Sequence, residues 1–101
     1  MAVLDTVMMS NIPLKIENLK KEDVNREILR VGMIAELDAV NLYEQMAAMT
    51  SSSDIRKMLL DIAKEEKTHL GEFQALLLDI DKEQVKELEA GRKEVEKELK
   101  K

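Results

Sequence analysis

Cysteine is absent from the sequence, and its absence excludes several classes of chemistry. Without thiols the chain cannot form disulfides, zinc–thiolate sites, iron–sulfur clusters or a cysteine nucleophile. Histidine is almost as scarce, because His69 is the single one. Any metal ion bound by one chain must therefore be held by oxygen atoms and at most one imidazole.

Basic residues are outnumbered, and aromatic residues and proline are rare. The 101 residues include 16 Lys and Arg against 21 Asp and Glu, a net charge of −5, with one Tyr, one Phe, no Trp and one Pro. The acidic balance argues against a nucleic-acid partner, which would require a basic patch. A charged fraction of 37% is typical of a helical protein and predicts an all-α fold. A single domain this short is marginally stable alone, so we expect a second copy as partner.

Long apolar runs are also missing. The first 19 residues are mildly apolar, but Asp5 interrupts them and no basic segment precedes them. We therefore expect neither a signal peptide nor a membrane-spanning helix, and hence no membrane partner. The expected location is the cytoplasm or a compartment within it.

What the sequence does contain is helical periodicity in two segments of similar length. After an irregular leader (residues 1–22), helices are predicted at residues 24–49 and 54–79, with Ser53 as N-cap and Asp54 in the first turn of the second helix. The break between them is short and rich in hydroxyl residues, which favours an antiparallel hairpin. We assign residues 23–80 to this hairpin. Because a two-helix hairpin cannot cover its own apolar stripe, two copies should dimerise into a four-helix bundle.

The C-terminal segment, residues 81–101, is almost entirely charged. Asp81 with Gln84 resembles a capping box, and the pairs Glu89–Lys93 and Glu96–Lys100 have favourable helical spacing. These features predict a short third helix. It is either a solvated tether or a segment that docks on another protein through a thin apolar edge made of Val85, Leu88, Val95 and Leu99.

Each hairpin helix carries an apolar seam with heptad spacing, and three ionisable residues interrupt the two seams. The first seam is Leu29, Met33, Glu36, Val40, Tyr43 and Ala47, and the second is Ile55, Leu59, Ile62, Glu66, His69, Phe73 and Leu76. A buried carboxylate must be paired or bound to a cation, and neither seam contains Lys or Arg. The hairpin brings Glu36 level with Glu66, and the E-x-x-H spacing puts Glu66 and His69 on one helix face. These three residues are therefore predicted metal ligands.

The ligand count predicts the assembly. Di-iron sites in helical bundles use a Glu from each of two helices and a Glu-x-x-His from each of the other two. One chain offers half of that set, and two chains related by a two-fold axis supply the whole. Carboxylates with imidazole also suit Fe(II). We therefore expect iron as the cofactor, in a di-iron (Fe2+/Fe3+) site on the interface of a homodimer.

Two stretches of the hairpin resemble a known family. The residues A-E-L-D-A-V-N-L-Y-E-Q-M-A (35–47) and L-L-D-I-A-K-E-E-K-T-H-L-G-E-F (59–73) are similar to the encapsulated ferritin family of the ferritin-like superfamily, in particular to the ferritin-like domains of archaeal encapsulin fusions. The resemblance covers about residues 24–90. It departs from some members at Ala35, where they have Glu, and at Leu42, where they have Trp.

The resemblance implies a function and further site residues. It implies a ferroxidase that oxidises Fe(II) to Fe(III) at the dimer interface and feeds iron storage in an encapsulin nanocompartment. It matches Glu36, Glu66 and His69 to iron ligands and Tyr43 to the tyrosine beside the site. It also matches Glu65 and Asp38 to accessory acidic positions. The implied partners are copies of the chain in a decameric ring and an encapsulin shell protein.

Other functions fit the same residues. A non-enzymatic dimeric helical adaptor would use the polar seam residues only to fix pairing. A redox-silent site for Mn or Zn would use the same ligands. A rubrerythrin-like peroxidase is disfavoured, because its usual rubredoxin module needs cysteines. Tyr43 is either a core aromatic or a redox residue. The sequence does not determine the native metal, the oxidant, the number of dimers, the role of residues 1–22, or whether the chain is free or part of a shell fusion.

Overall fold

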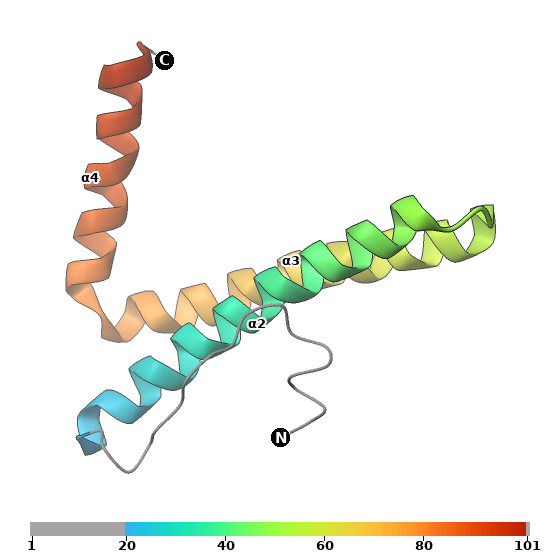
Figure 1. The fold of residues 1–101 in the computed structure, drawn as a ribbon. Coiled ribbons are helices and arrows are strands. Elements are labelled where there is room, and N and C mark those ends of the chain that lie inside the picture. Colours follow the sequence, from blue (N-terminus) through green and yellow to red (C-terminus); the bar gives the residue numbers. More distant parts are fainter. Residues whose placement is uncertain (1–19, 101) are drawn as a thin grey trace.

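The computed structural model describes residues 20–100, which form three helices. These are α2 (Lys21–Met49), α3 (Ser53–Ile80) and α4 (Lys82–Leu99), and no strand occurs among the described residues (Figure 1). The all-α prediction is confirmed. The predicted leader falls outside the described residues except at its end, where α2 already begins at Lys21. None of the helices in residues 20–100 is long and apolar enough to cross a membrane.

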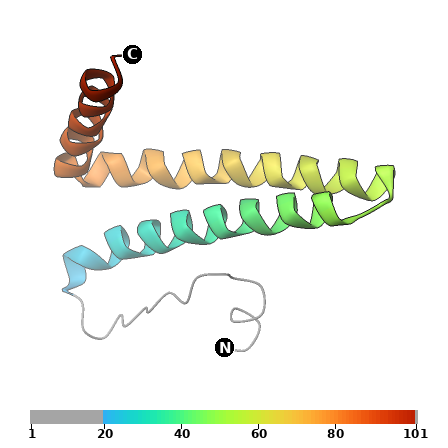
Figure 2. The same ribbon diagram turned by 45° about the horizontal axis from the view of Figure 1, so that its top comes forward.

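Helices α2 and α3 run side by side in opposite directions, as the short connection predicted (Figure 2). The N-cap of α3 is Ser52 rather than the predicted Ser53, and its hydroxyl accepts a hydrogen bond from the Ile55 amide at 3.2 Å. Three serines in succession offer the same capping chemistry, so composition alone could not choose among them. The Arg56 side chain at the beginning of α3 ties this connection to the end of α2, because it donates hydrogen bonds to the carbonyls of Ala47 and Thr50 at 3.1 and 2.5 Å.

The interior of the hairpin is narrow. Four apolar residues within the described range 20–100 are buried, namely Val40, Ala47, Ala63 and Leu77. The seam predicted for α2 faces this interior, because Val40 and Ala47 belong to it. In α3 the buried positions are Ala63 and Leu77, one residue beyond the predicted Ile62 and Leu76. One edge of the apolar sector of α3 therefore packs on α2, and the other edge remains exposed.

A glycine allows the two helices to approach closely. A Cβ atom added at Gly32 in α2 would lie 2.9 Å from the ring of Phe73 in α3. The ring of Phe73 thus occupies the space that any other side chain would take at position 32.

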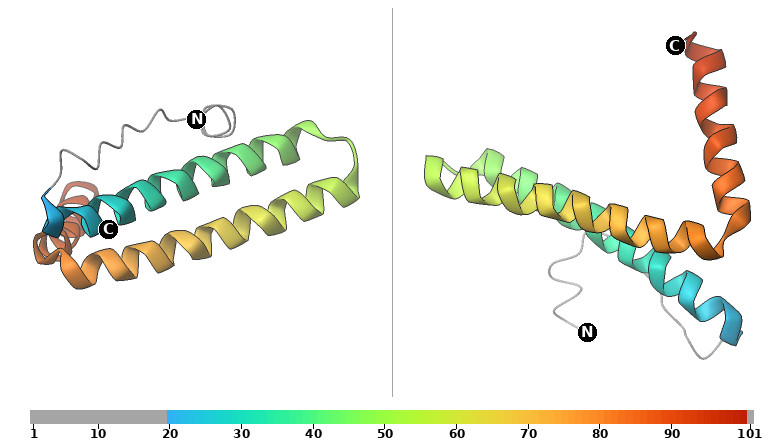
Figure 3. Two further views of the ribbon diagram at one scale, coloured as in Figure 1. Left: turned by 90° about the horizontal axis from the view of Figure 1, so that it is seen from below. Right: turned by 180° about the vertical axis from the view of Figure 1, so that it is seen from behind.

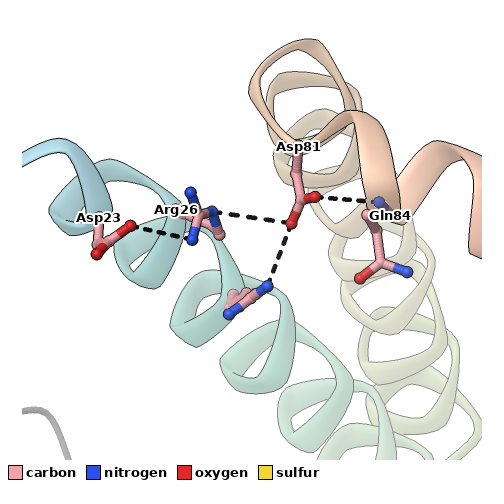
Figure 4. Close-up of polar contacts among 5 residues, drawn as sticks. Asp23, Arg26, Asp81 and Gln84 are labelled. Carbon is pink, nitrogen blue, oxygen red and sulfur yellow. Dashed lines mark hydrogen bonds and ion pairs between the residues drawn. The ribbon is translucent and has the colours of Figure 1, made fainter.

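Helix α4 leaves the hairpin at a steep angle and extends away from it (Figure 3). The junction is held by Asp81, whose side chain is 12% exposed. One carboxylate oxygen of Asp81 accepts a hydrogen bond from the Gln84 backbone amide at 3.0 Å, which is one of the two bonds of the predicted capping box (Figure 4). The Asp81 amide donates to the Leu77 carbonyl at 2.9 Å and so does not form the other. The other carboxylate oxygen of Asp81 lies 3.2 Å from the Arg30 guanidinium and 3.8 Å from that of Arg26. A single carboxylate therefore caps α4 and ties it to α2.

The remainder of α4 is solvated. It continues through Gly91, contains no buried residue and leaves its thin apolar edge exposed. The predicted pairs of Glu89 and Glu96 with lysines are not formed. Both glutamates pair instead with Arg92, Glu89 at 2.7 Å, because Arg92 lies between them at helical spacing and offers a forked guanidinium.

Candidate metal centre

The hairpin brings Glu36, Glu66 and His69 together near the middle of its length. Glu36 comes from α2, and Glu66 and His69 lie one turn apart on α3. One potential ligand atom from each residue lies within 4.8 Å of the other two. The Nδ1 atom of His69 is 3.6 Å from a carboxylate oxygen of Glu36 and 3.5 Å from one of Glu66. The three residues selected from the sequence thus form one cluster.

These separations suit atoms that share a cation better than atoms that bond to each other. Two ligand atoms that each lie about 2.1 Å from one ion are about 3.0–3.5 Å apart. The separation of 3.6 Å between His69 and Glu36 is too long for a strong hydrogen bond. The cluster could hold a metal ion without a large rearrangement.

The two carboxylates of the cluster are largely removed from solvent. Their side chains are 17% exposed for Glu36 and 19% for Glu66, whereas His69 is 44% exposed. The oxygen Oε2 of Glu36 is buried without a hydrogen-bond partner. Among the described residues, no lysine or arginine forms an ion pair with Glu36 or Glu66. A buried oxygen without a partner is rare in folded proteins and is expected where an ion binds.

The electrostatics of the cluster reflect this lack of positive charge. Burial raises the pKa of Glu36 from its ordinary 4.5 to about 7, the adjacent Glu66 carboxylate raises it as well, and His69 opposes both. Burial lowers the pKa of His69, but the charges of Glu36 and Glu66 outweigh this effect and raise it above its ordinary value. Without a cation, the cluster therefore holds protons that the same residues would lose in water.

The other predicted site residues lie outside the cluster. Tyr43 is half-buried on α2, about two turns beyond Glu36. Glu65 is exposed and Asp38 is buried, and neither contributes an atom to the group that could hold a metal. Sequence reasoning missed Glu72, whose negative charge also raises the pKa of His69. Its position three residues after His69, on the same helix face, was the available signal.

Comparison with known proteins identifies the family. The family model described as Rubrerythrin matches residues 27–100. A ferritin-like-encapsulin shell fusion protein of Pyrococcus furiosus is 62% identical over 69 residues, which are 68% of this chain and 20% of that protein. The chain thus spans about one fifth of the length of this curated relative.

A solved structure agrees with this match. The crystal structure of an encapsulated ferritin domain from Pyrococcus furiosus superposes with a TM-score of 0.74 and 49% identity, over 91% of this chain and 88% of the other. The predicted resemblance to encapsulated ferritins is confirmed. Because the family model covers most of the chain, this protein belongs to the rubrerythrin family of ferritin-like proteins, and within it the chain resembles the encapsulated ferritin domains.

Proposed function

We propose that this protein is a ferroxidase, which oxidises Fe(II) to Fe(III) at a di-iron site on the interface of a homodimer. The observation that carries the proposal is the convergence of Glu36, Glu66 and His69, in which one carboxylate oxygen of Glu36 is buried without a hydrogen-bond partner. This donor set combines hard oxygen with borderline nitrogen, as Fe(II) prefers. Membership of the rubrerythrin family supports iron as the metal.

The dimer follows from the number of ligands. One chain provides two carboxylates and one imidazole, which is half of the set used by di-iron carboxylate bundles. A two-fold axis beside the cluster would double it, and His69 lies on the open side where a second chain can approach. In this proposal Glu66 and His69 of each chain would hold one Fe(II) ion, and the Glu36 carboxylates of the two chains would supply further oxygen ligands.

A paired site suits the electron count of the reaction. Each Fe(II) substrate ion gives up one electron. Two ions together therefore supply the two electrons that reduce dioxygen to hydrogen peroxide, or hydrogen peroxide to water, with two protons taken from solvent. Tyr43 is proposed to hydrogen-bond a ligand or to donate an electron, and Glu65 and Asp38 are proposed accessory carboxylates. A single hairpin encloses no storage cavity, so Fe(III) would leave for storage elsewhere.

The relatives suggest where that storage occurs. One relative is a fusion of a ferritin-like protein with an encapsulin shell, and a solved structure is titled an encapsulated ferritin domain. We propose that this protein acts with an encapsulin shell, inside the compartment that the shell forms, and that its dimers assemble into a decameric ring.

The test is the rate of Fe(II) oxidation in air, followed by absorbance, for wild type and Glu66→Ala. The wild type should oxidise Fe(II) far faster than buffer, and Glu66→Ala should fall to the protein-free rate. Asp61→Asn is the matched control, because Asp61 is an exposed carboxylate on α3 outside the cluster, and this variant should keep the wild-type rate. Circular dichroism checks that each variant is helical, and Glu66→Gln provides a variant of nearly unchanged shape.

Metal binding is measured separately by calorimetry with Fe(II) under anaerobic conditions. One ion per chain should bind to wild type, and none to Glu66→Ala. If wild type binds the metal but oxidises Fe(II) no faster than buffer, the site is redox-silent. If it binds no metal, the polar seam residues serve only helix pairing, as in an adaptor.

A further inference from the structure

One face of α3 remains open to solvent on the side of the hairpin where His69 is exposed. We call it the open face, and its members recur every three, four or seven residues, which places them on one side of a helix. They are Ile55, Met58, Ile62, His69, Leu76 and Ile80. Four of them are large apolar residues that are half exposed, namely Ile55 (54%), Met58 (58%), Leu76 (55%) and Ile80 (48%). Glu65 and Glu72 flank His69 on this face.

The chemistry of the open face is symmetric about the metal cluster. The midpoint of Glu66 and His69 is position 67.5, the midpoint of Ile55 and Ile80 is also 67.5, and that of Met58 and Leu76 is 67. Any set of positions at heptad spacing has a midpoint, so the spacing alone is not informative. The order of residue types is specific to this helix, because exposed apolar residues lie at both ends and polar residues lie at the centre. At 1.5 Å per residue, each apolar end lies about 16 Å from the centre.

A notch opens at one of these two ends. It has a volume of about 280 Å³ and lies between the beginning of α2 and the end of α3, lined by Asn25, Ile28, Leu29, Leu76, Asp79 and Ile80. Its volume lies just below the roughly 300–1,000 Å³ of pockets that hold drug-sized ligands. Its apolar lining suits one or two apolar side chains. The other end of the open face presents two such side chains, Ile55 and Met58.

We propose that Ile55 and Met58 of a second copy of this chain fill the notch, and that the two resulting contacts fix the register of the dimer. The proposal rests on the proposed function in one respect, because the occupant is the second copy that completes the metal site. A two-fold axis perpendicular to α3 at the level of the cluster makes the two α3 helices antiparallel. It then places Met58 opposite the partner's Leu76, and Ile55 opposite the partner's Ile80, at both ends of the interface.

The register of the dimer needs to be fixed, because the heptad spacing of α3 would also allow the two α3 helices to pack after one has shifted along the other. A shift of α3 along its partner by one heptad would keep apolar residues in contact, but it would separate the two sets of ligands by about 10 Å. The notch accepts the protruding side chains only when the ligand sets are level. The contacts at the two apolar ends of the open face therefore bring the metal ligands of the two chains to the same level.

The absence of cysteine makes the register directly measurable. In the double variant Met58→Cys/Leu76→Cys, a short bismaleimide should link the thiol at position 58 of each chain to the thiol at position 76 of the other. The product is a covalent dimer at twice the 11.6 kDa mass of the chain. A link within one chain cannot form, because the two positions lie about 27 Å apart on one straight helix. Each single variant should stay monomeric on a denaturing gel, because equivalent positions in the two chains are about 28 Å apart.

A matched control and a second pair keep the test decisive. Leu60→Cys/Leu76→Cys should give no covalent dimer, because Leu60 is 47% exposed on another side of α3. Ile55→Cys/Ile80→Cys should cross-link as the first pair does. Cross-linking of the Leu60 pair, or of any single variant, to the same extent as the first pair would overturn the register. So would the absence of cross-linking in both double variants.

The same samples separate this inference from the proposed function. If the first pair cross-links and the linked dimer fails to oxidise Fe(II), the register stands and the ferroxidase proposal fails. If Fe(II) is oxidised in a Glu66-dependent reaction while neither pair cross-links, the ferroxidase proposal stands and the register is wrong.

Discussion

The hairpin (α2 and α3) and α4 are both helical, but different interactions stabilise them. The hairpin buries apolar side chains between two helices, at Val40, Ala47, Ala63 and Leu77. Helix α4 buries none, and local interactions support it, namely the Asp81 cap at its beginning and the glutamates paired with Arg92. Burial is what makes the hairpin a suitable place for chemistry, because it raises the pKa of the Glu36 carboxylate there, whereas in α4 the pKa of the exposed Glu89 is lowered by its Arg92 partner.

The largest expected effect is the difference between two leucine truncations. Leu77→Ala should lower the free energy of unfolding by about 2–5 kcal/mol, because Leu77 is 3% exposed in the hairpin interior. Leu88→Ala in α4 removes the same atoms from a residue that is 44% exposed. This substitution should change the free energy of unfolding by less than about 0.5 kcal/mol. Urea unfolding followed by far-UV circular dichroism, at one protein concentration for both variants, measures the difference. An equal loss for Leu88→Ala would mean that α4 is covered in the assembled protein.

The parts of the hairpin that could be predicted from sequence depend on periodicity and on the chain's direction. The apolar period locates both helices, and a short connection sets two positions at equal distance from it side by side. This is why Glu36 and Glu66 could be placed level from the sequence alone. His69 could be added to the cluster because residues three positions apart, as in E-x-x-H, lie on the same face of a helix.

The features that could not be predicted depend on small rotations or on contacts distant in sequence. The apolar sector of α3 is wide, so Ile62 and Ala63 were equally good candidates for the interior, and only packing against α2 selects Ala63. The ion pair of Arg30 with Asp81 joins residues 51 positions apart. Its existence depends on the angle between α4 and the hairpin, which no local pattern encodes.

Titration should distinguish the hairpin from α4 in a second way. Folding raises the pKa of Glu36 from 4.5 to about 7, so the folded chain binds its proton more tightly than the unfolded chain. The metal-free protein should therefore lose stability as pH rises from about 5 to 8, by at most about 3 kcal/mol. The raised pKa of His69 acts in the same direction, because the stability it contributes is also lost as pH rises through its folded value.

The measurement is the unfolding free energy of the metal-free protein at several pH values. Glu36→Gln should remove most of the slope between about pH 5 and 8. Glu89→Gln in α4 is the control, because Arg92 lowers the pKa of Glu89, which therefore stays ionised throughout this range. If the slope survives in Glu36→Gln, another group of the hairpin takes up the proton.

The smallest and sharpest contrast uses glycine, because one substitution should have opposite signs in the two regions. Gly91→Ala should stabilise α4 by about 0.5–1 kcal/mol, since nothing lies within 4 Å of the new Cβ and alanine is the better helix former. Gly32→Ala gains the same helical preference, but its Cβ would lie 2.9 Å from the Phe73 ring. Overpacking of this kind costs about 1–3 kcal/mol, so the net change should be a loss of about 1 kcal/mol.

A substitution at Gly71 tests whether the loss expected for Gly32→Ala comes from its location in the hairpin or from its contact with the Phe73 ring. Gly71 lies in the hairpin, yet nothing is within 4 Å of the Cβ that Gly71→Ala would add. Thermal unfolding of the three alanine variants should therefore group Gly71→Ala with Gly91→Ala, as stabilising, and set Gly32→Ala apart. If Gly32→Ala were stabilising as well, the Phe73 ring would have room to move, and close packing would not be what holds α2 and α3 at their separation. If Gly71→Ala were destabilising, its outward side would be covered, and the partner would contact more of α3 than the open face alone.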